Sequence, residues 1–269
     1  MTNQTPTFIQ SKLDIHRWWV TAILIVMNVG LFFWAVLHGM DVSSPNTLDA
    51  IRWGADFAPL TFLAEPQRLL TSMFFHFGLA HLMLNMWALY IFGSIAEQLY
   101  GRCYFIGLYV LAGLMGSLLS GYISIQESYK ILELGQIEPT LLPSVSAGAS
   151  GAVMGLGASL TILALLPPLP KQRFLLDRKT LIIVMALNLA IGFTITGINN
   201  AAHIGGMLMG ILLTLLWYIG QKLKYSGLWS ILGLVVGSML CIIFYQYCQT
   251  LIQAIHPFWQ DLMNWMLKA

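Results

Sequence analysis

The chain has 269 residues, of which 58% are hydrophobic and only 9% are charged, whereas soluble domains carry about 25% charged residues. So few charges cannot cover a water-soluble globule, and a formal net charge of +2 offers no basic surface to nucleic acid. The composition therefore excludes a soluble enzyme, a disordered chain and a nucleic-acid-binding protein. Uncharged runs that are too long for barrel strands instead predict an all-α polytopic membrane protein.

Seven apolar runs are long enough to predict transmembrane helices, which need about 20 residues each. In chain order they cover about 18–37, 75–99, 103–125, 150–166, 181–198, 202–219 and 228–251. Basic residues precede the first run and no small-residue cleavage site follows it, so we do not expect a signal peptide. The stretch after residue 252 mixes Trp, Met and Leu with polar residues, and we expect a short tail at the membrane interface.

Lysine and arginine predict the orientation, because they gather in cytoplasmic loops. Nine of the thirteen basic residues fall on one side of the predicted helices: Lys12, Arg17, Arg102, Lys171, Arg173, Arg178, Lys179, Lys222 and Lys224. The other four are Arg52, Arg68, Lys130 and Lys268. We therefore expect a cytoplasmic N-terminus and an external C-terminus. A short chain without a transit peptide is typical of the bacterial inner (plasma) membrane.

Few polar side chains fall at membrane depth, where they are costly and mark candidate functional sites. The second predicted helix carries His76, His81 and Asn85, the fourth begins at Ser150, and His203 lies near the start of the sixth. These three helices run from outside to inside in the predicted orientation, so the five groups share one depth near the outer face. A serine with histidines and an amide can supply the nucleophile, base and hydrogen-bond donors of acyl transfer.

Glycines spaced four apart predict how two of these helices meet. Gly151 and Gly155 form a small-residue face on the fourth predicted helix, and Gly206 and Gly210 form one on the sixth. Such faces let two helix backbones approach closely. If the two helices pack through them, the serine and the histidine at their outer ends come within reach of each other.

Three motifs follow one another along the chain: His76-Phe77-Gly78-Leu79-Ala80-His81-Leu82-Met83-Leu84-Asn85, Gly148-Ala149-Ser150-Gly151, and Ala202-His203-Ile204-Gly205-Gly206 with Gly210. In these motifs the chain resembles the rhomboid intramembrane serine proteases. The resemblance implies a rhomboid-like six-helix catalytic core over 18–222. We expect a cytoplasmic segment (1–17) before this core, an additional transmembrane helix (227–252) after it, and the interfacial tail at 253–269.

The resemblance also implies a role for each matched residue. Ser150 would be the nucleophile and His203 the general base, while His81 and Asn85 would line the oxyanion site. The same site would include Gly148 and His76, with structural support from Arg68, Gly151, Gly206 and Gly210. No acidic residue shares the depth of His203, which favours a Ser-His dyad over a triad. We expect no cofactor and no metal.

The implied substrate is the transmembrane helix of another membrane protein, which enters from the lipid bilayer and unwinds locally. The physiological substrate and the oligomeric state are left open. Two positions depart from the family pattern: Gln67 stands where many members have Trp, and Met154 stands where some bacterial members have Tyr. The first departure affects the anchoring of the outer loop, and the second leaves no aromatic ring predicted under the general base.

Three alternatives remain open at this stage. The chain could be a catalytically inactive relative that binds membrane helices, although such proteins usually lack the serine or the histidine. His76, His81 and His203 could form a zinc site, which would leave the serine and the asparagine unexplained. A transporter would be expected to show internal symmetry or paired broken helices, and the sequence shows neither.

Overall fold

The computed structural model describes residues 15–169, 176–194 and 199–266. Seven longer helices make up most of this part of the chain: α1 (Trp19–Leu37), α5 (Leu79–Tyr100), α6 (Arg102–Leu134), α7 (Ser150–Leu165), α8 (Arg178–Thr194), α9 (Asn200–Lys222) and α10 (Ser226–Met266). Shorter elements lie between them: η1 (Ile15–Arg17), α2 (Thr47–Arg52), β1 (Asp56–Phe57), α3 (Ala58–Leu63), α4 (Arg68–Thr71), η2 (Ser72–Phe74), η3 (Pro139–Leu141) and β2 (Val145–Ser146). The all-α polytopic class is confirmed.

Among the described residues, five helices are long and apolar enough to cross a membrane: α1, α5, α6, α9 and α10. The other two long helices are shorter, with 16 residues in α7 and 17 in α8. The chain is thus an integral membrane protein, while the seven crossings and the N-in, C-out orientation stay predictions. Four basic residues used for that orientation (Lys12, Lys171, Arg173 and Lys268), most of segment 1–17, and residues 195–198 lie outside the described part.

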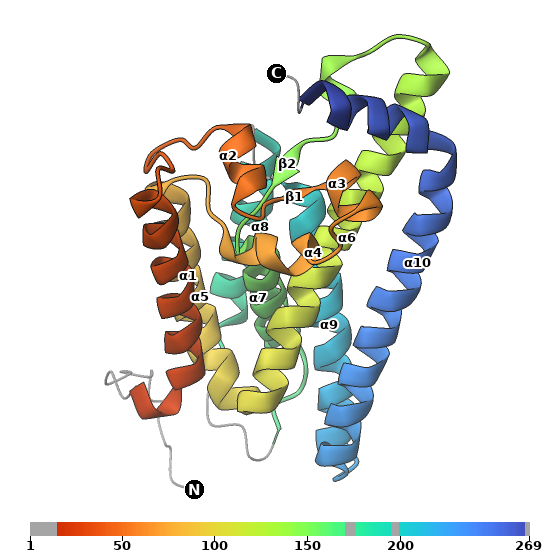
Figure 1. Cartoon of the computed structure of the whole chain (residues 1–269). Coiled ribbons are helices and arrows are strands. Elements are labelled where there is room, and N and C mark those ends of the chain that lie inside the picture. The colour runs from red at the N-terminus through yellow and green to blue at the C-terminus, as the bar shows by residue number, and fades with distance from the viewer. Residues whose placement is uncertain (1–14, 170–175, 195–198, 267–269) are drawn as a thin grey trace, which may run out of the picture.

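The helix α7 occupies the centre of the bundle (Figure 1). Every residue from Gly151 to Leu160 is buried, as expected for a helix that is apolar on all sides. It packs against α9 and α6. The helix α10 packs against α6 and α9, and α1 packs on α5. The central helix therefore holds its first residue, Ser150, between neighbouring helices.

The segment 39–74, which the sequence predicts to be the first outer loop, forms a cap of short elements over one end of the bundle (Figure 1). Within it, β1 pairs antiparallel with β2, so that Asp56 lies opposite Ser146 and Phe57 opposite Val145. The buried Arg68 side chain donates to the carbonyl oxygens of Ile51 at 2.6 Å and Ala55 at 2.9 Å. The Arg68 contacts hold this segment together, and the β1–β2 pair joins it to the segment that precedes Ser150.

Two helices extend beyond their expected ends. The third predicted helix was expected to end near residue 125, but α6 continues to Leu134. The seventh was expected to end at 252, but α10 includes the expected tail as far as Met266. Pro257 lies inside it and lacks the N–H that would bond one turn back, which favours a bend. Figure 1 shows the dark blue end of α10 turned across the end of the bundle.

Candidate active site

The N-terminal ends of α7 and α9 bring Ser150 and His203 together. Ser150 is the first residue of α7, and His203 lies in the first turn of α9. The Ser150 Oγ and His203 Nε2 atoms are 3.0 Å apart, which is hydrogen-bond distance. The imidazole is buried, whereas the serine is half-buried. The hydroxyl is thus positioned to donate its proton to the histidine.

Close packing between the two glycine faces accounts for this proximity. A Cβ atom on Gly206 would collide with the carbonyl oxygen of Gly151, and one on Gly210 would collide with that of Gly155. Only residues without a side chain allow the two backbones to lie this close. The predicted packing of the two helices through their glycines is therefore observed.

A side-chain cap fixes the start of α9. The Asn199 Oδ1 atom accepts a hydrogen bond from the Ala202 N–H at 3.0 Å, which satisfies one of the free donors of the first turn. Its Nδ2 group donates to Ser120 Oγ on α6. The sequence analysis gives Asn199 no role, although an asparagine directly before a helix is a recognised start signal.

The side chains of His81 and Asn85 face Gly148, two residues before the serine. A Cβ atom on Gly148 would lie 2.9 Å from His81 Nε2 and 3.8 Å from Asn85 Nδ2. The glycine adopts a φ of +119°, which other residues rarely adopt. His81 Nδ1 accepts a hydrogen bond from the Phe77 N–H at 3.2 Å. A neutral His81 therefore carries its proton on Nε2, the nitrogen that faces Gly148.

His76 lies on the same side of the site, in the segment between η2 and α5. It is almost fully buried, and its ring lies edge-on to that of His81 with centroids 5.3 Å apart. Its Nε2 atom accepts a hydrogen bond from the Ala149 N–H at 3.5 Å, a long contact. It also borders a largely apolar cavity of about 300 Å³ between α1 and the outer loop. Its ring thus contacts both His81 of α5 and the loop that precedes Ser150.

Two connections hold the loop that leads to Ser150. The Gly148 N–H donates to the carbonyl oxygen of Ser72 at 2.9 Å, and the β1–β2 pair lies just before it. In β1, Asp56 accepts a hydrogen bond from Thr61 Oγ1 at 2.6 Å. Burial raises the pKa of the Asp56 carboxyl to about 6, against the opposing effects of Thr61 and Arg68. No sequence pattern marked Ser72, because it contributes only a backbone oxygen.

Comparison with known proteins gives the family. Residues 64–221 match the family model described as the Rhomboid domain. The chain belongs to the rhomboid family.

Several curated relatives of this rhomboid chain are similar to it over different lengths. "Rhomboid protease AarA" of Providencia stuartii is 27% identical over 91% of this chain and 89% of that protein. "Rhomboid protease GluP" of Bacillus subtilis is 33% identical over 71% of the chain. "RHOMBOID-like protein 6, mitochondrial" of Arabidopsis thaliana is 36% identical over 55% of it. The chain spans only 33% and 43% of the length of the last two relatives.

Among the residues that the structure describes, no acidic side chain bonds the second ring nitrogen of His203. In the part that the structure describes, His203 Nδ1 is buried without a hydrogen-bond partner. No set of three His, Cys, Asp or Glu residues in the same part could hold a metal ion.

The structure also describes the two positions that depart from the family pattern. Met154, four residues after the serine, is buried within α7. Gln67 directly precedes α4, and its side chain forms no cap there.

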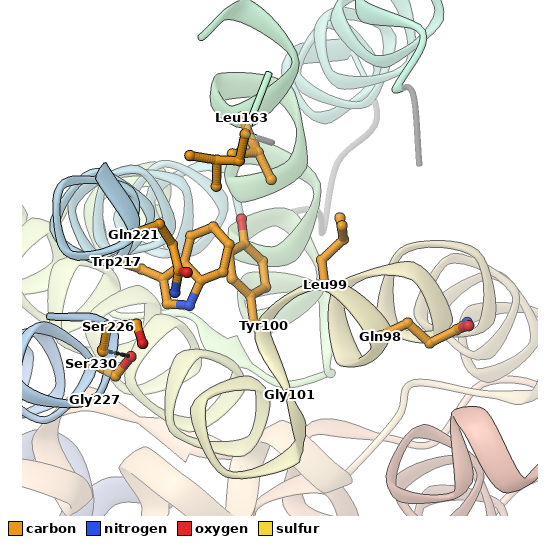
Figure 2. Close-up of a pocket in the computed structure, with 11 residues that line it drawn as sticks. Gln98, Leu99, Tyr100, Gly101, Leu163, Trp217, Gln221, Ser226, Gly227 and Ser230 are labelled. Atoms are coloured by element: carbon orange, nitrogen blue, oxygen red, sulfur yellow. Dashed lines mark hydrogen bonds between the residues drawn. The ribbon is translucent and has the colours of Figure 1, made fainter. Parts of the chain in front are cut away.

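A larger cavity, of about 520 Å³, lies at the other end of the rhomboid bundle, and Figure 2 shows the residues that line it. It is lined by the ends of α5 and α9 and the start of α10, including Tyr100, Trp217, Gln221 and Ser230. Leu163, another lining residue, is thirteen positions after Ser150 on α7, which corresponds to about 20 Å along a helix. The cavity contains no histidine and no acid among its lining residues, so it is separate from the candidate active site.

Proposed function

We propose that the chain is an intramembrane serine protease that cleaves a peptide bond in or near the transmembrane helix of membrane-protein substrates. The observation that carries the proposal is the 3.0 Å distance between Ser150 Oγ and His203 Nε2 beside His81 and Asn85. Membership of the rhomboid family, and relatives named as rhomboid proteases, support the same reaction.

In the proposed first half-reaction, His203 Nε2 takes the proton of the Ser150 hydroxyl while Oγ attacks the carbonyl carbon of the substrate. The tetrahedral intermediate carries a negative oxygen, to which His81 Nε2–H and Asn85 Nδ2–H donate hydrogen bonds. When the intermediate collapses, the C–N bond breaks and the leaving amine takes the proton from His203. The product is an acyl-enzyme on Ser150.

In the second half-reaction, water attacks the acyl carbon and gives a proton to His203. The ester bond breaks, and the serine oxygen regains its proton from the histidine, so the enzyme returns to its starting state. The dyad and the donors lie near the outer ends of their helices, which favours the access of water from that side. This location also suits a substrate helix that unwinds locally near one membrane surface.

The deciding experiment measures cleavage of a reporter transmembrane helix and labelling by a serine-directed fluorophosphonate. We expect Ser150→Ala and His203→Ala each to abolish cleavage, with Ser150→Ala also abolishing labelling. The matched controls Ser94→Ala and His16→Ala remove the same side chains far from the site and should leave both readouts intact. Full activity in Ser150→Ala or His203→Ala would overturn the dyad. A wild-type protein that binds the reporter but is neither labelled nor active would support the inactive-relative alternative.

The oxyanion role has its own test. We expect His81→Ala and Asn85→Ala each to lower kcat by about 10²–10³ with little change in KM, because oxyanion donors act mainly in the transition state. Steady-state kinetics, normalised to fluorophosphonate-labelled Ser150, measure this directly. An unchanged kcat in the double variant would exclude the role.

A further inference from the structure

The outer half of α10 contacts the short helix α3 of the outer loop. Gln249 Nε2 donates to the backbone oxygen of Phe62 at 2.9 Å and to Tyr245 Oη at 2.8 Å. The carbonyl groups of the last turn of any helix lack partners within that helix, so Gln249 satisfies one that α3 leaves open. Both α3 and α10 lie outside the residues that match the Rhomboid domain model.

Aromatic packing reinforces this contact. The Phe62 ring stacks on Tyr245 with centroids 5.7 Å apart, and lies 6.5 Å from the ring of Trp259. The Phe62 ring also approaches Gly121 of α6 so closely that a Cβ atom there would collide with the ring. Trp259 is fully buried and donates from Nε1 to Ser128 Oγ at 2.8 Å. The end of α10 thus fixes α3 against the extended part of α6.

The helix α3 is in turn connected to the segment before Ser150. Thr61 of α3 donates its hydroxyl to the Asp56 carboxyl at 2.6 Å, and Asp56 lies opposite Ser146 in the β1–β2 pair. The strand β2 ends two residues before Gly148. An unbroken series of contacts therefore runs from α10 to the oxyanion side of the candidate active site.

These elements are too small to hold themselves in place. The helix α3 has six residues and each strand has two, whereas isolated helices below about 12 residues and single two-stranded pairs are marginal in water. Their position must come from packing against larger elements, and α10 supplies a large apolar contact of this kind. Removing that contact should loosen β1 and β2 before it affects the helices of the core.

We propose that α10 positions the loop directly before Ser150 (143–149) through α3 and the β1–β2 pair, with Gln249 and Trp259 as the positioning residues. The inference rests on the proposed protease activity, in which the loop presents Ser150 and Gly148 to the substrate. It gives the additional helix a role that the six-helix core alone does not require.

The test compares Gln249→Ala with Gln246→Ala, which removes the same side chain from an exposed position one turn earlier on α10. The first readout is amide hydrogen exchange of a peptide covering 143–149 in the full-length protein. We expect exchange there to be about tenfold faster in Gln249→Ala, the effect of one lost hydrogen bond, and unchanged in Gln246→Ala. A peptide covering 103–111 of α6 should exchange as in the wild type in both variants.

The second readout is kcat and KM for a reporter helix, normalised to fluorophosphonate-labelled Ser150. We expect kcat to fall about tenfold in Gln249→Ala, with KM changed less than about twofold, since a misplaced loop affects the reacting groups more than the remote binding surface. A purely structural role would lower the amount of labelled enzyme while kcat per labelled site stays constant.

Two milder variants keep the proposal testable if Gln249→Ala does not fold. Gln249→Met keeps the chain length without the N–H donor, and Trp259→Phe keeps a ring without the bond to Ser128. Both should show the same changes to a smaller degree. Exchange at 143–149 equal to that of Gln246→Ala in every variant would overturn the inference. A wild-type protein without Ser150-dependent cleavage would overturn the proposed function, while the exchange data would still decide whether α10 positions the loop.

Discussion

A single added methyl group on α9 tests whether helix packing sets the geometry of the proposed dyad. In Gly206→Ala the methyl carbon would lie 2.8 Å from the carbonyl carbon of Gly151, and closer to its oxygen. Carbon atoms in contact are about 3.5–4.0 Å apart, so α7 and α9 have to separate by roughly 1 Å. The distance of 3.0 Å between Ser150 Oγ and His203 Nε2 then exceeds the hydrogen-bond range.

We therefore expect kcat to fall about 100-fold, the effect of a displacement near 1 Å in an active site. Overpacking should also lower the free energy of unfolding by about 1–3 kcal/mol. Reporter cleavage per labelled Ser150 and thermal unfolding in detergent measure the two effects. The control is Gly30→Ala on α1, where a Cβ atom meets nothing within 4 Å. Wild-type kcat in Gly206→Ala would refute the argument that this contact positions the dyad.

Two further predictions concern residues away from the dyad. Because burial raises the pKa of Asp56 from 3.8 to about 6, the folded state binds this proton more tightly than the unfolded state. Its contribution to stability is complete below about pH 4 and is lost as the pH rises through 6. Between these pH values the free energy of unfolding of the wild type, relative to that of Asp56→Asn, should fall by up to ~3 kcal/mol, as measured by thermal unfolding. An identical pH dependence in both proteins would contradict this prediction. Glu97 accepts hydrogen bonds from the N–H groups of Val20 and Thr21 at the start of α1, so Glu97→Ala should lower the free energy of unfolding by about 1–2 kcal/mol. Glu97→Gln should lose less, and neither variant should change kcat per labelled site; a lower kcat would indicate a link to the active site.

The sequence predicts the long helices and the grouping of polar residues well, because both depend on local information. A long apolar run identifies a helix by itself, and the polar side chains stand out against it. The glycine pairs on α7 and α9 add a contact between two distant segments of the chain. Without side chains, Gly151 and Gly206 allow the two helix backbones to approach closely at these positions. Together these features predict that Ser150 and His203 come within reach of each other.

The outer loop could not be predicted in the same way. The strands β1 and β2 have two residues each and pair across about 90 positions of the chain, so no alternating pattern could reveal them. The continuation of α10 past residue 252 was also missed, because polar residues there weaken the apolar signal. Its support is non-local: Trp259 donates a hydrogen bond to Ser128, which lies in the equally unpredicted extension of α6.

No acid bonds His203 in the part of the chain that the structure describes, and this changes what has to orient the proposed base. In a Ser-His-Asp triad the carboxylate bonds the second ring nitrogen and fixes both the tautomer and the ring orientation. Within the described residues His203 Nδ1 has no partner, so the orientation has to come from the backbone that carries the ring. That backbone is fixed by the Asn199 cap in the same turn and by the contact of Gly206 with Gly151 one turn later. In the proposed dyad, helix packing therefore does the work of the missing carboxylate, and the rate should depend on contacts that in most proteins affect stability alone.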